Sequence, residues 1–214
     1  MNGYPVLLNV ENRRCVVVGG GQVATRKVSA LLDAGAQICL ISPAISPILQ
    51  QLSDEGRIEI RRVAYHPDHL TEIKPFLVIA ATDNPIVNQQ VAADATQMNI
   101  LINVVDAPPY GDFTNMATIQ RGPIVVGIAS GGASAALSAY IKAQIEAILG
   151  PEIERLAGWM GEARKEIQAS GLNQPERAAL WQKVLDSPIL DLLRRGDSTS
   201  ARLLFDELLA EGIR

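Results

Sequence analysis

Residues 14–24, with the sequence RCVVVGGGQVA, decide the fold of this chain. A run rich in β-branched side chains, residues 14–18, stops at three glycines, residues 19–21, and apolar residues then recur at helical spacing from Val23 onward. This succession predicts a strand, a glycine turn and a helix. It also matches the pattern G-x-G-x-x-G/A, in which glycines permit a tight turn and let a pyrophosphate approach the backbone.

The pattern repeats along the first half of the chain. Apolar stretches of strand length alternate with helical stretches, which is typical of a doubly wound parallel α/β sheet of the Rossmann type. We expect strands at Gln37–Ile41, Ile58–Arg62, Phe76–Ala80 and Leu101–Val105, with helices around Ser46–Glu55 and Pro85–Gln97 and a polar stretch containing His66 and His69.

The texture changes after Asp106. Residues 118–120 and 124–128 read as two strands joined by a short turn, which predicts an antiparallel hairpin. An alanine-rich helix is expected at about residues 134–149, and every later segment reads as helix, with amphipathic stretches at 189–195 and 202–209. The predicted fold is therefore a Rossmann domain, a small α+β domain and a helical C-terminal module.

Composition narrows the class of protein. With 214 residues, 48% of them hydrophobic, the chain can bury one full core and a smaller module. The net charge of -4 and the lack of a basic cluster argue against a nucleic-acid partner. The apolar runs are far shorter than the ~20 residues that cross a bilayer, and residues 1–12 lack a signal-peptide layout, so we expect a cytoplasmic protein with no membrane partner.

The glycine turn predicts an NAD site. Helix N-termini present N–H groups that bind phosphates. Where NAD enzymes carry an acidic residue for the ribose, this chain has Ser42, whose hydroxyl can bond a ribose hydroxyl, and no arginine follows it in sequence, which favours NAD over NADP. The residues expected to contact NAD are Gly19, Gly20, Gly21, Gln22, Val23, Ser42, Pro43, Thr82, Asp83 and Asn103.

Polar groups follow the two later strands of the predicted sheet. Thr82 and Asp83 come after one, and Asn103 and Asp106 accompany the other. Ligands bind outside the carboxyl ends of such strands, so Asp106 is the candidate proton acceptor. The alternative is that both carboxylates only shape turns or cap helices, and for Asp83 that alternative is favoured.

Neither cysteines nor histidines indicate further chemistry. Cys15 and Cys39 fall inside apolar strands, where a thiol is usually a small core side chain. His66 and His69 lack further spaced ligands, so no metal site is predicted.

Four motifs in order resemble a known family. VVVGGGQVATRK, VIAATDNP, NVVDAP and RGPIVVGIASGGAS, followed by an alanine-rich helix, resemble the precorrin-2 dehydrogenases, including the N-terminal half of siroheme synthases. The resemblance implies oxidation of precorrin-2 to sirohydrochlorin with NAD+ by a homodimer, and in some members insertion of Fe2+. It implies a dimerisation and substrate domain at 113–149, between an NAD-binding domain at 1–112 and a helical module at 150–214.

The resemblance also assigns site residues. It places the catalytic aspartate at Asp106, and a substrate-lining segment at Ser130, Gly131 and Gly132. Because this tetrapyrrole substrate carries many carboxylates, Arg121 is a further candidate for binding it.

Two other functions remain as alternatives. One is a non-catalytic NAD-sensing Rossmann module, which has no use for the NVVD motif or the SGG helix. The other is a dehydrogenase for a small substrate, which the absence of a Ser-Tyr-Lys or histidine-based set disfavours.

Overall fold

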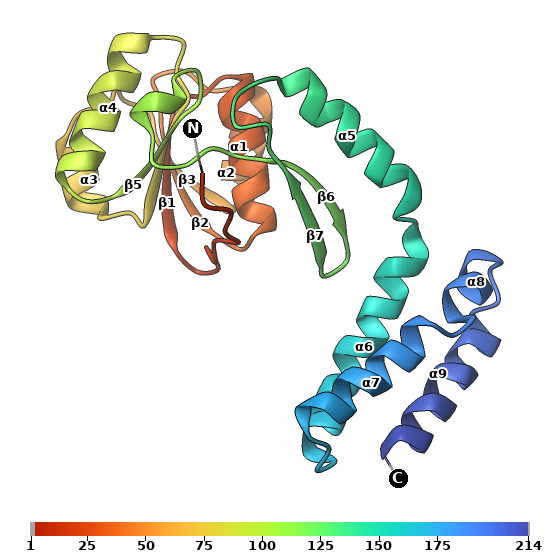
Figure 1. Cartoon of the computed structure of the whole chain (residues 1–214). Coiled ribbons are helices and arrows are strands. Elements are labelled where there is room, and N and C mark those ends of the chain that lie inside the picture. The colour runs from red at the N-terminus through yellow and green to blue at the C-terminus, as the bar shows by residue number, and fades with distance from the viewer. Residues whose placement is uncertain (1–2, 214) are drawn as a thin grey trace. The chain divides into compact units, whose positions relative to one another are not determined.

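The computed structural model describes residues 3–213, and the chain divides into two compact units between Asn115 and Met116. The first unit holds a sheet flanked by helices, and the second holds a hairpin followed by five helices (Figure 1). Within the described residues, no helix is both long and apolar enough to cross a membrane.

The first unit is a five-stranded parallel sheet in the order β3-β2-β1-β4-β5. The chain order reverses between β1 and β4, which creates the crevice where ligands bind in such sheets. The elements are β1 Arg14–Val18, α1 Gln22–Asp33, β2 Gln37–Ile41, α2 Pro47–Asp54, β3 Ile58–Arg61, α3 Asp68–Ile73, β4 Leu77–Ala80, α4 Pro85–Gln97, β5 Leu101–Val104 and the 3-10 turn Pro108–Tyr110.

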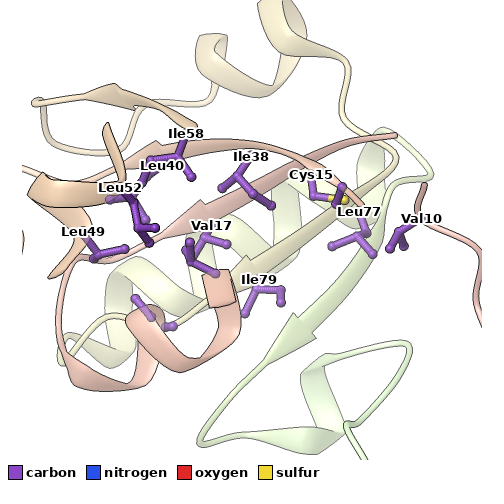
Figure 2. Close-up of a cluster of buried hydrophobic side chains, with 14 residues drawn as sticks. Val10, Cys15, Val17, Ile38, Leu40, Leu49, Leu52, Ile58, Leu77 and Ile79 are labelled. Atoms are coloured by element: carbon purple, nitrogen blue, oxygen red, sulfur yellow. The ribbon is translucent and has the colours of Figure 1, made fainter. Parts of the chain in front are cut away.

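The strands form because their side chains are apolar on both faces, and each face has its own core. Val17 and Leu40 pack with Leu49 and Leu52 of α2 on one face, part of which Figure 2 shows. The opposite face packs against α3 and α4. Burying such a side chain fully contributes roughly 1.5–3 kcal/mol. The doubly wound α/β architecture predicted from the sequence is thereby confirmed.

Local sequence sets the helix starts. Ser46 caps α2 by accepting the Leu49 N–H at 3.3 Å, and Pro47 occupies the first turn, where a missing N–H costs nothing. The stretch around His66 and His69 differs from expectation, because its second half forms the short helix α3, anchored by the buried Leu70.

The second unit begins with an antiparallel hairpin, as predicted, between β6 Ala117–Arg121 and β7 Ile124–Ile128. Helix α5, Ala135–Ile148, follows, and we call residues 117–148 the hairpin–helix segment. Helices α6 Pro151–Ala169, α7 Gln174–Leu185, α8 Ile189–Arg194 and α9 Ser198–Ile213 form a bundle. Its own core centres on the fully buried Phe205.

Both cysteines lie in the sheet, as predicted. Cys15 and Cys39 are buried and form no disulfide. Desolvation raises the pKa of each thiol to about 11.

Candidate cofactor site and active site

The first two glycines of the turn are required by backbone packing. Gly19 has φ +121°, and a Cβ there would collide with the carbonyl oxygen of Ala81 at the end of β4. A Cβ at Gly20 would collide with the carbonyl oxygen of Ala44 and lie 2.8 Å from Ser42 Oγ. The turn therefore lies against the segments that follow β2 and β4.

The third glycine faces open space. No atom lies within 4 Å of the position that a Cβ on Gly21 would take, and Gly21 is the N-cap of α1 with no side chain capping the helix. The first N–H groups of a helix lack partners within it and carry partial positive charge. Gln22 is exposed beside them, and the half-buried Val23 packs on the core. These residues fit a dinucleotide pyrophosphate.

The buried Thr25 holds this turn in place. Its hydroxyl donates to the Gly21 carbonyl oxygen at 2.9 Å and contacts the Ser46 hydroxyl at 2.9 Å. Thr25 thereby joins the starts of α1 and α2 next to the glycine turn.

Hydrogen bonds to Ala44 and to Arg61 hold Ser42 at the end of β2. The Ser42 hydroxyl donates to the Ala44 carbonyl oxygen at 2.6 Å, and the adjacent Pro43 is exposed. Although no arginine follows Ser42 in sequence, the Ser42 N–H donates to the Arg61 carbonyl oxygen of β3 at 3.1 Å. This contact involves only the Arg61 backbone, and the Arg61 guanidinium pairs with Glu72 at 2.6 Å, so the preference for NAD over NADP stays a prediction.

The segment after β4 is fixed by a buried amide. Asn88 of α4 is 5% exposed, and its Oδ1 accepts from the Thr82 N–H at 3.1 Å and from Thr82 Oγ1 at 2.7 Å. Its Nδ2 donates to the Thr82 carbonyl oxygen at 3.0 Å. Asn84, and not Asp83, caps α4, so the helix-capping alternative for Asp83 is wrong.

Asp106 and Asp83 line one small pocket of about 140 Å³. Both carboxylates are exposed, which leaves them accessible to a ligand. Three of the residues predicted for the site, Thr82, Asp83 and Asp106, are thus brought together. The remaining lining residues are Pro85, Asn88, Gln89, Val104 and Ala107.

Asn103 is buried and is not among the residues that line this pocket. Its Nδ2 donates to the Phe113 carbonyl oxygen at 2.8 Å, and within residues 3–213 its buried Oδ1 has no hydrogen-bond partner. Asn115 lies two residues after Phe113 in the chain, and its Oδ1 accepts from Lys27 Nζ of α1 at 2.6 Å. Asn103 therefore holds the segment that leaves the sheet, and its contact with NAD stays a prediction.

In the second unit, the Arg121 side chain contacts residues of that same unit. Its Nε donates to the Leu149 carbonyl oxygen at 2.8 Å, and its guanidinium lies 3.6 Å from a carboxylate oxygen of Glu146. These contacts hold the end of α5 against the hairpin. Binding of substrate by Arg121 remains a prediction.

Ser130, Gly131 and Gly132 form a tight loop before α5. Ser130 Oγ accepts from the Ser134 N–H at 3.1 Å and donates to the Ser134 carbonyl oxygen at 3.0 Å, while both glycines have positive φ, 64° and 88°. Ser134 caps α5. The substrate-lining role of the loop stays a prediction.

The sequence reasoning missed Asn88. One signal was available, because Asn88, Val91, Ala92 and Ala95 recur at the spacing of one helix face, and the three apolar members predict that this face is buried. A polar residue on a buried face needs partners, which here are the polar groups of Thr82.

Among the described residues, no group of three or more His, Cys, Asp or Glu could hold a metal ion.

The parallel sheet with its glycine turn and open helix N-terminus defines a Rossmann-type dinucleotide-binding domain. Residues 6–117, just over half of the chain, match the family described as putative NAD(P)-binding, and residues 152–209 match the sirohaem synthase dimerisation region. The chain belongs to the NAD(P)-binding family of siroheme synthases and precorrin-2 dehydrogenases, as its motifs predicted. The predicted nicotinamide dinucleotide cofactor is confirmed at the level of NAD(P).

Individual relatives agree with this family. The siroheme synthase of Nitrosospira multiformis is 36% identical over 206 residues, which are 94% of this chain and 43% of that protein. Siroheme synthase 1 of Aeromonas salmonicida is 37% identical over 212 residues, 99% of this chain and 45% of that protein. The chain thus spans less than half the length of these relatives.

A solved structure confirms the fold. The structure of SirC, precorrin-2 dehydrogenase, matches with a TM-score of 0.76 at 22% identity and covers 96% of this chain and 100% of that chain. The predicted order of a Rossmann sheet, a small α+β segment and a helical module is confirmed.

Proposed function

We propose that this chain oxidises precorrin-2 to sirohydrochlorin with NAD+, as a step of siroheme synthesis. The observation that carries the proposal is the pocket holding Asp106, Asp83 and Thr82, because it lies at the carboxyl ends of β4 and β5 and the β4 end also lies against the glycine turn. The siroheme synthase relatives and the likeness to SirC, precorrin-2 dehydrogenase, support the substrate.

The oxidation removes a hydride and a proton from the substrate. NAD+, when bound, would supply the hydride acceptor. Residues 19–23 would hold the pyrophosphate, Ser42 and Pro43 the adenosine end, and Thr82, Asp83 and Asn103 the nicotinamide end. The exposed Asp106 carboxylate takes the proton from the substrate and releases it to solvent.

The same carboxylate suits insertion of Fe2+, which would make siroheme. A metal that enters a tetrapyrrole replaces the pyrrole N–H protons, so a base at the ring is needed. Asp106 supplies that base, with Asp83 in the same pocket. Fe2+ is a substrate in this reaction and not a resident cofactor.

We further propose a cytoplasmic homodimer organised as an NAD-binding domain at 1–112, a dimerisation and substrate domain at 113–149 and a helical module at 150–214. Ser130, Gly131, Gly132 and Arg121 would contact the carboxylate-rich tetrapyrrole. The match of residues 152–209 to a dimerisation region supports self-association and extends it into the helical module.

The deciding experiment supplies precorrin-2 with NAD+, and in parallel with NADP+, and follows the absorbance of sirohydrochlorin. Turnover with NAD+ is expected, and adding Fe2+ or Co2+ then tests metal insertion. NAD+ binding without turnover, together with an inert Asp106→Ala change, would instead support the NAD-sensing module.

A further inference from the structure

Asn88 forms hydrogen bonds with all three polar groups of Thr82. Its amide bonds the Thr82 N–H, carbonyl oxygen and hydroxyl at 3.1, 3.0 and 2.7 Å. A carboxamide has both acceptors and donors, so the neutral amide of asparagine completes this set. The peptide units on both sides of Thr82 are thereby fixed to α4.

The helix does not need Asn88 for its own formation. Asn84 already caps α4, accepting from the Ile86 and Val87 N–H groups at 3.0 and 3.4 Å, and Pro85 occupies the first turn. An apolar side chain at position 88 would extend the buried face that Val91 begins. The amide is therefore directed at the loop and not at the helix.

Thr82 lies between the two parts of the site. A Cβ on Gly19 would lie 3.0 Å from the Thr82 nitrogen, so the backbone held by Asn88 packs directly against the cofactor turn. Thr82 and Asn88 both also line the pocket of Asp83 and Asp106. A shift of this loop would change the turn and the pocket together.

We infer that Asn88 is a positioning residue, which sets the distance between the dinucleotide at the glycine turn and the carboxylates of the pocket through its hold on Thr82. The inference rests on the proposed function for its kinetic consequence. Its consequence for NAD+ binding is independent of any tetrapyrrole.

The test compares two buried polar residues of the same helix. Asp94, 8% exposed, accepts from Tyr65 Oη at 3.0 Å and from Gln90 at 2.9 Å, and it does not line the pocket. Asn88→Leu and Asp94→Leu each remove buried hydrogen bonds from α4, so both should lower the melting temperature. Only Asn88→Leu is expected to weaken NAD+ binding, about tenfold, and to lower kcat/KM by about 10- to 100-fold.

Equal NAD+ affinities in Asn88→Leu, Asp94→Leu and the wild type, measured by calorimetric titration, would overturn the inference. This binding result decides it even if the wild-type chain fails to oxidise precorrin-2, an outcome that would remove only the proposed function. If the wild type turns over but Asn88→Leu keeps full kcat/KM, the positioning role is likewise lost.

Asn88→Asp keeps the size of the side chain and guards against misfolding of the leucine variant. The ionised carboxylate still accepts from Thr82 but cannot donate to its carbonyl oxygen, whereas the protonated acid can. NAD+ affinity relative to wild type is therefore expected to rise as the pH falls from 8 to 5. Asp83 and Asp106 line the same pocket in both proteins, so the affinity is read as a ratio to wild type, and a ratio that stays at one throughout would contradict the inference.

Discussion

The sheet of the first unit and the hairpin–helix segment bury their apolar side chains to very different extents. Every residue of β4 is buried, and the sheet has a core on each face. In the hairpin–helix segment, all of which the structure describes, Ile119 is the single buried apolar residue. Leu137 is 50% exposed, Tyr140 63% and Ile148 71%.

This difference separates the part of the chain that buries its apolar side chains by itself from the part that leaves them available for association. The sheet completes its cores from its own sequence and holds the glycine turn and the Asp106 pocket. The hairpin–helix segment forms regular structure by local hydrogen bonding, but its apolar residues other than Ile119 stay at least partly exposed. Clustered exposure of this kind marks association surfaces, which agrees with the proposed homodimer.

The largest effect is expected at the glycine turn. Gly21→Val places a side chain where the pyrophosphate would lie, so NAD+ binding should become undetectable by calorimetric titration. The position has open space, so the fold should survive with a near-normal melting temperature. Gly20→Val is the contrast, because a Cβ there meets the Ala44 carbonyl oxygen, and it should lose the fold itself. Wild-type NAD+ affinity in a folded Gly21→Val protein would refute the assignment of the turn.

Asp106→Asn tests whether the chemistry lies at the sheet. The amide keeps the size of the side chain but cannot take a proton, so kcat should fall by about 100- to 10,000-fold with NAD+ affinity unchanged. Asp33→Asn, an exposed change at the end of α1, serves as the matched control. A loss confined to KM would mean that Asp106 only places the substrate.

The sheet core should be sensitive to truncation at any protein concentration. Leu40 of β2 is fully buried between the sheet and the helices that cover this face. Leu40→Ala should therefore lower the free energy of unfolding by about 2–5 kcal/mol. Chemical denaturation at two protein concentrations measures the loss. A cost that vanishes at high concentration would tie the sheet to association and erase the contrast between the two regions.

Leu137→Glu probes the other side of the comparison. A charge on the exposed face of α5 should raise the dissociation constant of the dimer about tenfold or more, with little change in the unfolding of the sheet. Sedimentation velocity across a concentration series measures it. Ile48→Glu, a change at a similarly exposed position on α2, is the control. A dimer unaffected by Leu137→Glu would place the interface away from α5.

Continuous local patterns made most of the fold predictable. Strands β1, β2 and β4 carry unbroken apolar runs, β3 and β5 carry interrupted ones, and the hairpin strands are joined by a turn at Gly122, so their positions follow from the sequence to within a residue or two. Helix α3 was missed because its six residues, DHLTEI, include just two apolar side chains, Leu70 and Ile73, which are buried only through tertiary packing.

The site was predictable where it follows strand ends and not where it depends on register. Thr82, Asp83 and Asp106 meet because parallel strands end at the same edge. Arg61 lies beside Ser42 through the pairing of β2 with β3, which no adjacency in sequence reveals. Asn88 is a third case, since its partners became visible only with the backbone of Thr82.

The buried thiols of Cys15 and Cys39 make the sheet report on its own opening. With each pKa at about 11, roughly one thiol in 10,000 is ionised at pH 7, and neither is accessible in the closed sheet. Alkylating reagents must therefore wait for the strands to separate. The rate of cysteine modification therefore measures how often the first unit opens. It reports on that unit alone, because the sequence contains two cysteines and both lie there.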